Sequence, residues 1–147
     1  MDKNIYPVPE ATKERTLVTQ AQYEDMYARS VNDNEGFWAD QAKRVDWIKP
    51  FTKVKDVSYA KDDLHIRWYE DGTLNACYNC VDRHLADKAD DVAIIWEGDD
   101  PARDLKITYA ELHERVCKFA NALKALGAKK GDRITIYMPM IPEAAVS

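Results

Sequence analysis

The stretch from Lys106 to Ser147 constrains the fold more than any other part of the chain. Thr108 precedes Glu111 by three residues, the spacing of a capping box that satisfies free N–H groups at a helix start. Large apolar residues then recur at alternating spacings of four and three, on one helical face: Leu112, Val116, Phe119, Leu123 and Leu126. Gly127 suits the left-handed position that ends many helices. The pattern predicts an amphipathic helix that needs a partner surface.

A polar turn and a short apolar segment follow this helix. Lys129 to Asp132 is polar, whereas Ile134 to Met138 is β-branched and mostly apolar, as in a strand buried on both faces. Pro139 ends that strand, and Pro142 suits the first turn of another helix. This order of elements predicts a parallel α/β sheet. Ligands usually bind beyond the carboxyl ends of strands in such sheets, here near Met138 to Pro142.

Composition excludes several classes of protein. A chain of 147 residues has room for about one domain, and its net charge of −5 gives no support for a nucleic-acid or anionic-membrane surface. No apolar run approaches the ~20 residues that cross a bilayer. The chain begins with no hydrophobic signal core, and its three cysteines do not suit a disulfide framework. We therefore expect a cytoplasmic protein.

The first third of the chain predicts an arm followed by short helices. Residues 1–18 contain Pro7 and Pro9 and no helical stripe, so we expect an extended arm there. Thr19 and Gln22 form a second capping-box pair, which predicts a helix from Gln20 to about Arg29.

Aromatic residues gather after this helix. Asn32-Asp33 breaks the helix and is expected to cap a short one that carries Phe37 and Trp38, and Trp47 and Phe51 follow. The aromatics suit either a base-stacking or partner-binding surface, or a packed cover over a larger core. Stacking platforms line a basic groove, and this region is not notably basic. The packed cover is therefore the favoured interpretation.

Four extended segments are expected in the middle of the chain. Leu64 to Tyr69 alternates apolar and polar residues, which predicts a strand, and Val54 to Tyr59 is a weaker extended segment. Val92 to Trp96 and Leu105 to Thr108 bracket an acidic loop, Glu97 to Asp104. We interpret these last two segments as an antiparallel hairpin.

Thr73 is expected to cap a helix that runs to about Leu85. Cys77 and Cys80 form a CxxC pattern within it, which suits redox or metal chemistry as well as core packing. A structural zinc site needs four ligands, but the chain has no second CxxC. A redox pair usually lies at a helix start, whereas Thr73 would begin this helix earlier. We therefore expect buried core thiols.

The histidines offer no catalytic constellation in the sequence. Asp82, Arg83 and His84 are consecutive, and consecutive helix residues point in different directions, so we do not expect them to act together. Arg83 is expected to form a salt bridge or to extend over the apolar stripe. His65 and His113 are isolated in the sequence and are expected to be hydrogen-bonded or exposed.

Two charged clusters are interpreted as solvated surface. The acidic loop offers carboxylates to a cation, but Ca²⁺ needs about six to eight oxygens in a compact loop, and Arg103 interrupts the run. Lys129, Lys130 and Arg133 flank a turn without a glycine cradle for phosphate. No residue is therefore assigned a catalytic, cofactor-binding or metal-binding role.

Four ordered segments resemble a known family. GAKKGDRITIYMPMIPEAAVS, at the end of the chain, resembles the start of the large domain of the AMP-forming adenylating enzymes, in their acetyl-CoA synthetase branch. WYEDGTLNACYNCVDRHL, IIWEGDD and ITYAELH are also similar to that branch. The likeness extends weakly back to Gln22-Tyr23 and to Gly36-Phe37-Trp38, and so covers most of the chain. The family commonly has cysteine at the Cys80 position, whereas Cys77 departs from it.

The resemblance implies an incomplete α/β protein. Its parts would be an extended arm at residues 1–18, the N-terminal cap region of an acetyl-CoA synthetase at 19–88, and the truncated start of an AMP-binding domain at 89–147. The last part would hold the first β-hairpin, helix and strand of that domain.

The same resemblance implies the activity of the parent enzyme. This ligase converts acetate, ATP and CoA to acetyl-CoA, AMP and pyrophosphate through acetyl-AMP, with Mg²⁺. The family's phosphate-binding loop, nucleotide contacts and lysine correspond to positions beyond Ser147, so we expect the 147 residues alone to bind none of these ligands and to be inactive.

Two alternatives stay open. One is a non-enzymatic interaction module, and the other is the same region of a ligase for propionate or another short acid. The expected partner is the remainder of the ligase, with no nucleic acid and no membrane. We also expect self-association through the unpaired strand at Ile134 to Met138.

Overall fold

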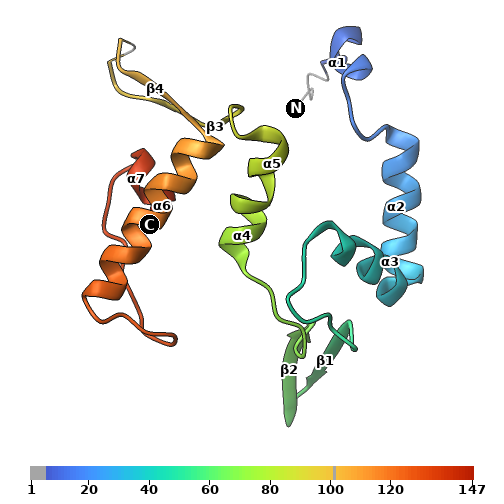
Figure 1. The fold of residues 1–147 in the computed structure, drawn as a ribbon. Coiled ribbons are helices and arrows are strands. Elements are labelled where there is room, and N and C mark those ends of the chain that lie inside the picture. The colour runs from blue at the N-terminus through green and yellow to red at the C-terminus, as the bar shows by residue number, and fades with distance from the viewer. Residues whose placement is uncertain (1–5, 101) are drawn as a thin grey trace. The chain divides into compact units, whose positions relative to one another are not determined.

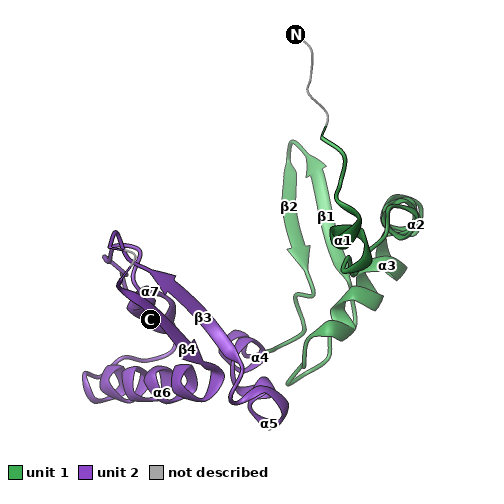
Figure 2. Cartoon of the chain, turned by 90° about the horizontal axis from the view of Figure 1, so that it is seen from above, with its two compact units in different colours: residues 1–74 green, residues 75–147 purple. Residues whose placement is uncertain are grey.

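The computed structural model describes residues 6–100 and 102–147, which form short helices and two β-hairpins (Figure 1). It divides into two compact units, Met1–Leu74 and Asn75–Ser147, and each contains helices and a two-stranded sheet (Figure 2). The predicted α/β class is confirmed. The first unit contains α1 (Glu10–Glu14), α2 (Gln20–Asn32), α3 (Asn34–Gln41), η1 (Ala42–Arg44), β1 (Lys55–Ala60) and β2 (Asp63–Trp68). The second contains α4 (Ala76–Cys80), η2 (Asp82–His84), α5 (Leu85–Lys88), β3 (Val92–Glu97), β4 (Asp104–Thr108), α6 (Tyr109–Ala125) and α7 (Pro142–Val146).

The arm expected at residues 1–18 is helical in part. Helix α1 begins after Pro9, carries Glu10 in its first turn, and joins Glu10 to Lys13 by an ion pair of 3.0 Å. These charges complement the helix dipole, and one turn needs no apolar stripe. The expectation of an extended arm is therefore wrong at α1. Residues 1–5 of the expected arm lie outside the described residues.

Two capped helices follow as predicted. Thr19 and Gln22 form the capping box of α2, with the Thr19 N–H donating to Gln22 Oε1 at 2.8 Å. The helix continues three residues beyond Arg29, to Asn32. The Asp33 carboxylate then accepts the Gly36 N–H at 3.2 Å and caps α3.

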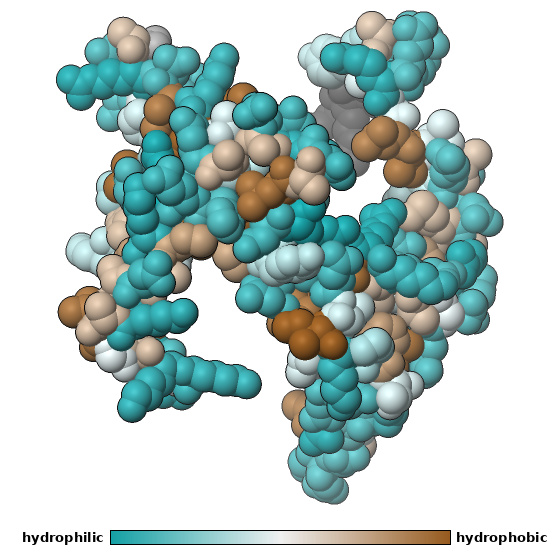
Figure 3. All heavy atoms as spheres, viewed as in Figure 1, coloured by the Kyte–Doolittle hydropathy of each residue, from teal (hydrophilic) through white to brown (hydrophobic). Residues whose placement is uncertain are grey.

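The β1–β2 hairpin is antiparallel, with Val57 opposite Ile66 and Tyr59 opposite Leu64. The strand predicted at Leu64 to Tyr69 is confirmed within one residue at each end. Residues that alternate along a strand share a face, so these two pairs form one apolar face. Leu64 is 69% exposed and Ile66 is 59% exposed, and Figure 3 shows such apolar groups on the surface among polar ones.

Aromatic rings pack in a row within the first unit. Trp38 contacts Trp68 at 5.9 Å between ring centroids, and Phe51 contacts Tyr69 at 4.7 Å. The Tyr69 hydroxyl also donates to the Trp38 carbonyl oxygen at 2.9 Å, which joins the residue after β2 to α3. Trp47 packs on Phe51 at 5.1 Å, so the row extends to the segment before β1. The rings therefore contact one another, as the packed-cover interpretation expects.

The core of the second unit joins β4 and α6 to the short helices. Val81, Ile107 and Leu112 are buried together, and Ile107 is fully inaccessible. Val116 and Val146 pack against this cluster, so α7 covers part of α6. No helix in the described ranges is long and apolar enough to cross a membrane.

Helix α6 has both predicted ends. The Thr108 N–H donates to Glu111 Oε2 at 2.9 Å, and the Glu111 N–H donates to Thr108 Oγ1 at 3.2 Å, so the capping box is confirmed. Gly127 has φ +90°, and the Ala128 N–H donates to the Leu123 carbonyl oxygen at 3.0 Å. This is the hydrogen bond of a Schellman motif, and glycine fits it because it has no Cβ.

The helix expected between Thr73 and Leu85 is broken. Its cap is Asn75, whose side chain accepts the Tyr78 N–H at 3.0 Å, so the assignment of Thr73 is wrong. The Thr73 backbone instead pairs with Lys49 across a β-bridge. At Val81, φ −124° and ψ −67° leave the helical region, and the chain continues as η2 and α5.

The strand expected at Ile134 to Met138 is absent from the described structure. These five residues pair with no other strand, and all are exposed, Tyr137 to 98%. A central parallel strand is held by hydrogen bonds to neighbours on both sides. The described sheets contain only β1–β2 and β3–β4, so the sequence signal has no sheet to join.

Candidate functional site

A hollow lies where the β3–β4 hairpin meets the segment after the expected strand. Its volume is about 480 Å³, and it is lined by Trp96, Glu97, Gly98, Asp99, Asp100, Arg103, Pro139, Met140 and Ile141. The Trp96 indole N–H donates to the Met140 carbonyl oxygen at 2.7 Å and holds the two walls together. The hollow includes Met140 and Ile141 of the stretch in which the sequence places ligands.

The walls of this hollow combine an aromatic ring with carboxylates. Trp96 and residues 139–141 supply the apolar part, and three acidic side chains supply the charge. Asp100 is already engaged, because it accepts the Ala102 N–H at 3.0 Å and lies 4.0 Å from Arg103 Nε. One of the three carboxylates of the hollow is therefore already paired within the loop.

The two cysteines of the CxxC are not core residues. Cys77 and Cys80 are both exposed and unbonded to each other, so the expectation of buried thiols is wrong. Asn75 caps α4, which places Cys77 in the first turn, contrary to the argument from Thr73. Partial burial nevertheless raises the pKa of the Cys77 thiol, and the Asp82 carboxylate adds to that rise. Reactive thiols need the opposite shift.

Asp82 joins two helices that are far apart in the sequence. Its carboxylate lies 3.5 Å from His113 Nε2 on α6 and 4.0 Å from Cys77 Sγ on α4. His113 Nε2 also lies 3.5 Å from Cys117 Sγ, one turn further along α6. His113 is therefore not isolated. The i, i+4 spacing of His113 and Cys117 was visible in the sequence, whereas Asp82 comes near only through the fold.

Arg83 and His84 face other partners, as expected for consecutive residues. Arg83 Nη1 donates to Asn79 Oδ1 at 2.9 Å, and the His84 ring lies 5.3 Å from the Tyr109 ring. Neither contact involves Asp82, so the three side chains form no acid–base unit.

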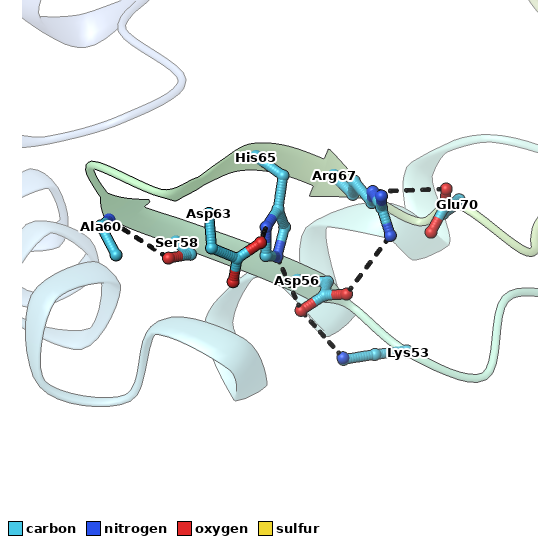
Figure 4. A network of polar contacts seen from close by, with 8 residues as sticks. All are labelled: Lys53, Asp56, Ser58, Ala60, Asp63, His65, Arg67 and Glu70. Atoms are coloured by element: carbon cyan, nitrogen blue, oxygen red, sulfur yellow. Dashed lines mark hydrogen bonds and ion pairs between the residues drawn. The ribbon is translucent and has the colours of Figure 1, made fainter.

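His65 lies in the polar network of the β1–β2 hairpin (Figure 4). Its Nε2 lies 3.3 Å from Asp56 Oδ1, and its Nδ1 lies 3.1 Å from Asp63 Oδ1. The hydrogen bond to Asp56 is the main cause that raises the pKa of His65. Lys53, 3.1 Å from Asp56, is the main cause that lowers the pKa of that carboxyl group. Sequence reasoning missed this network because Asp56 is on the opposite strand.

The last charged features are the basic turn after α6 and the acidic side chains. Lys129, Lys130 and Arg133 are exposed around a turn in which the Lys129 backbone N–H donates to Asp132 Oδ2 at 2.7 Å. Across residues 6–100 and 102–147, no three His, Cys, Asp or Glu side chains are arranged to hold a metal ion.

Comparison with known families accounts for most of the chain. Residues 23–80 match the family model "Acetyl-coenzyme A synthetase N-terminus", and residues 81–147 match the model "AMP-binding enzyme". The two models meet close to the division of the structure into units at Leu74 and Asn75.

Curated relatives match over nearly the whole chain. An acetyl-coenzyme A synthetase of Parvibaculum lavamentivorans is 59% identical over 145 residues, which are 99% of this chain and 22% of the relative. One of Vibrio cholerae is 56% identical over 146 residues, again 99% of this chain and 22% of the relative. The chain therefore spans about a fifth of the length of these relatives.

A solved structure has a similar fold. The acetoacetyl-CoA synthetase of Streptomyces lividans matches with a TM-score of 0.71 and 26% identity, over 92% of this chain and 21% of that one. The sequence and structure comparisons therefore point to the same group of proteins.

Proposed function

Because the chain belongs to the acetyl-CoA synthetase family, we propose that it is the N-terminal region of an AMP-forming acetate–CoA ligase. The observation that carries the proposal is the unbroken succession of the two family models along this chain, from residue 23 to residue 147. A relative that is 59% identical over 99% of the chain supports it. As in the sequence interpretation, the cap region is assigned to 19–88 and the start of the AMP-binding domain to 89–147.

The proposed reaction has two steps. An acetate oxygen attacks the α-phosphorus of ATP, pyrophosphate leaves, and acetyl-AMP forms. The CoA thiolate then attacks the acetyl carbonyl carbon, the bond to the AMP oxygen breaks, and acetyl-CoA and AMP result. Mg²⁺ would neutralise phosphate charge in the first step. The described residues include no ligand set for it, so we assign no metal ligand to this chain.

This region would contribute structure rather than reacting groups. We assign no catalytic, cofactor-binding or metal-binding residue between positions 6 and 147. The exposed apolar segment at Ile134 to Met138 supports a requirement for the remainder of the ligase, which would supply its neighbouring strands. In its absence we expect self-association through this segment. The proposed location of the ligase is the cytoplasm, with no nucleic-acid or membrane partner.

A chimera tests the proposed function. The chain replaces the matching 145 residues of the Parvibaculum lavamentivorans relative, and acetate-dependent ATP–pyrophosphate exchange and acetyl-CoA formation are measured. We expect activity in the chimera and none in the 147-residue chain. A folded but inactive chimera, or exchange by the 147-residue chain itself, would contradict the proposal.

The same assay separates the alternatives. Acetate, propionate and acetoacetate are compared as substrates, because the solved relative is an acetoacetyl-CoA synthetase. The interaction-module alternative is tested by mixing two separate polypeptides. One is the 147-residue chain, and the other is the relative without the residues that match this chain. Restored exchange supports a ligase region, whereas tight binding without exchange supports the module.

A further inference from the structure

The two faces of the β1–β2 hairpin differ in chemistry. Val57, Tyr59, Leu64 and Ile66 lie on the apolar face, and the alternate residues carry the polar network (Figure 4). Ser58 lies opposite His65 in the register, so His65 reaches Asp56 diagonally across the strands. Asp63, on the strand of His65 itself, occupies the other ring nitrogen at 3.1 Å.

Both nitrogens of the His65 ring thus face a carboxylate. A neutral imidazole carries one N–H and can donate to only one of them, leaving its lone pair against the other. The imidazolium carries two N–H groups and can donate to Asp56 and Asp63 at once. The geometry alone therefore favours the protonated ring.

The other charged groups of the network affect the carboxylates that face His65. Lys53 lies 3.1 Å from Asp56, and Arg67 Nη1 lies 3.9 Å from the other oxygen of Asp56. Arg67 Nε also lies 3.6 Å from Glu70. Both cations contact Asp56 and keep its carboxyl group ionised. Among the described residues, Asp63 forms its ion pair with His65.

We propose that His65 is a proton-dependent clasp, which joins β1 to β2 when the imidazole is protonated and releases Asp63 or Asp56 when it is not. The pKa of His65 is raised, mainly by its hydrogen bond with Asp56, which agrees with this geometry. A raised pKa means that the clasp is complete below the pKa of an unfolded histidine. It is lost as the pH rises through the higher pKa of the folded state. The clasp thus makes the stiffness of this hairpin depend on pH, and the hairpin loosens as the pH rises.

NMR titration of the 147-residue chain tests the clasp. The midpoint of the His65 ring signals is compared among the native chain, Asp56→Asn and Asp63→Asn. We expect the midpoint to fall in each variant. Asp62→Asn is the matched control, because Asp62 is adjacent to Asp63 and makes no ion pair with His65, and its midpoint should stay unchanged. Equal midpoints in all four chains would overturn the proposal.

Amide exchange gives a second readout that a purely structural histidine would not change. After correction for intrinsic rates, protection of the β1 and β2 amides should fall as the pH rises through the His65 midpoint. The fall should be roughly two- to fivefold, the range of exposed ion pairs. His65→Gln should show no such step. The same pH-dependent step in His65→Gln would contradict the clasp, whatever the outcome of the chimera assay.

Discussion

Asp71 fixes the backbone that precedes β1. Its carboxylate accepts the Thr52 N–H at 3.0 Å and the Thr52 hydroxyl at 2.7 Å. These hydrogen bonds, the one from the hydroxyl first, lower the pKa of the Asp71 carboxyl group. Asp71 precedes Gly72, and this pair of residue types is common in turns, but the link to Thr52 spans 19 positions and required the fold. Local turn chemistry was therefore predictable, and its partner was not.

Asp71 gives a pH prediction with a definite sign. A lowered pKa in the folded state means that the contribution to stability is complete above the unfolded pKa of about 3.9 and is lost as the pH falls through the folded value. In Thr52→Val, which keeps the N–H but loses the hydroxyl, the NMR titration midpoint of Asp71 should rise toward its ordinary value. An unchanged midpoint would show that the hydroxyl contributes nothing.

Thr108 and Thr73 form a matched pair for the capping assignment. Thr108→Ala removes the acceptor of the Glu111 N–H, so the free energy of unfolding of the second unit should fall by about 1 kcal/mol. Thr73→Ala should cost less, because Asn75 caps α4. Urea unfolding followed by circular dichroism checks both. A larger loss of unfolding free energy for Thr73→Ala would support Thr73 as the helix cap, as the sequence indicated.

At the scale of elements, helix α6 shows how far a periodic pattern determines packing. Leu112 is buried, Val116, Phe119 and Leu123 are half-buried, and Leu126 is 84% exposed. The stripe is continuous in sequence, but its burial decreases toward the C-terminal end because the core cluster lies at the first turns. Periodicity predicts which face is apolar, and the partner surface decides how much of it is buried.

The gradient along α6 predicts unequal effects of the same substitution. Leu112→Ala empties part of the cluster with Val81 and Ile107 and should lower the free energy of unfolding by roughly 2 kcal/mol or more. Leu126→Ala, on the same face but exposed, should change it by less than about 0.5 kcal/mol. Urea unfolding of both variants measures the difference. Equal losses would mean that α6 is packed along its whole length.

Elements with local signals were predictable from the sequence, and those that depend on distant partners were not. The capping boxes at Thr19 and Thr108 and the hairpin around the acidic loop need only neighbours in sequence, and they were located correctly. The segment at Ile134 to Met138 was predicted to be a strand and forms none, because propensity alone does not supply the hydrogen-bonded neighbours of a parallel sheet. The prediction of buried cysteines was wrong for a similar reason, because the burial of a side chain depends on all the residues that surround it in the fold.

At the scale of the whole molecule, exposed apolar groups are the main feature. Each unit leaves large hydrophobic side chains accessible, including Leu64 and Ile66 on the first hairpin and Ile136 near the end of the second unit. A chain that spans about a fifth of its relatives would leave surfaces of this kind for the remainder to cover. The function was inferred from the resemblance and not from a constellation of reactive side chains.

Hydrogen exchange at Ile134 to Met138 tests the central claim most directly, namely that this chain is the opening of an adenylating sheet completed by the rest of a ligase. The measurement compares the 147-residue chain as a monomer with the active chimera. We predict fast exchange of these amides in the monomer and strong protection in the chimera, where neighbouring strands pair with them. Strong protection in the monomer, or fast exchange in an active chimera, would contradict the account.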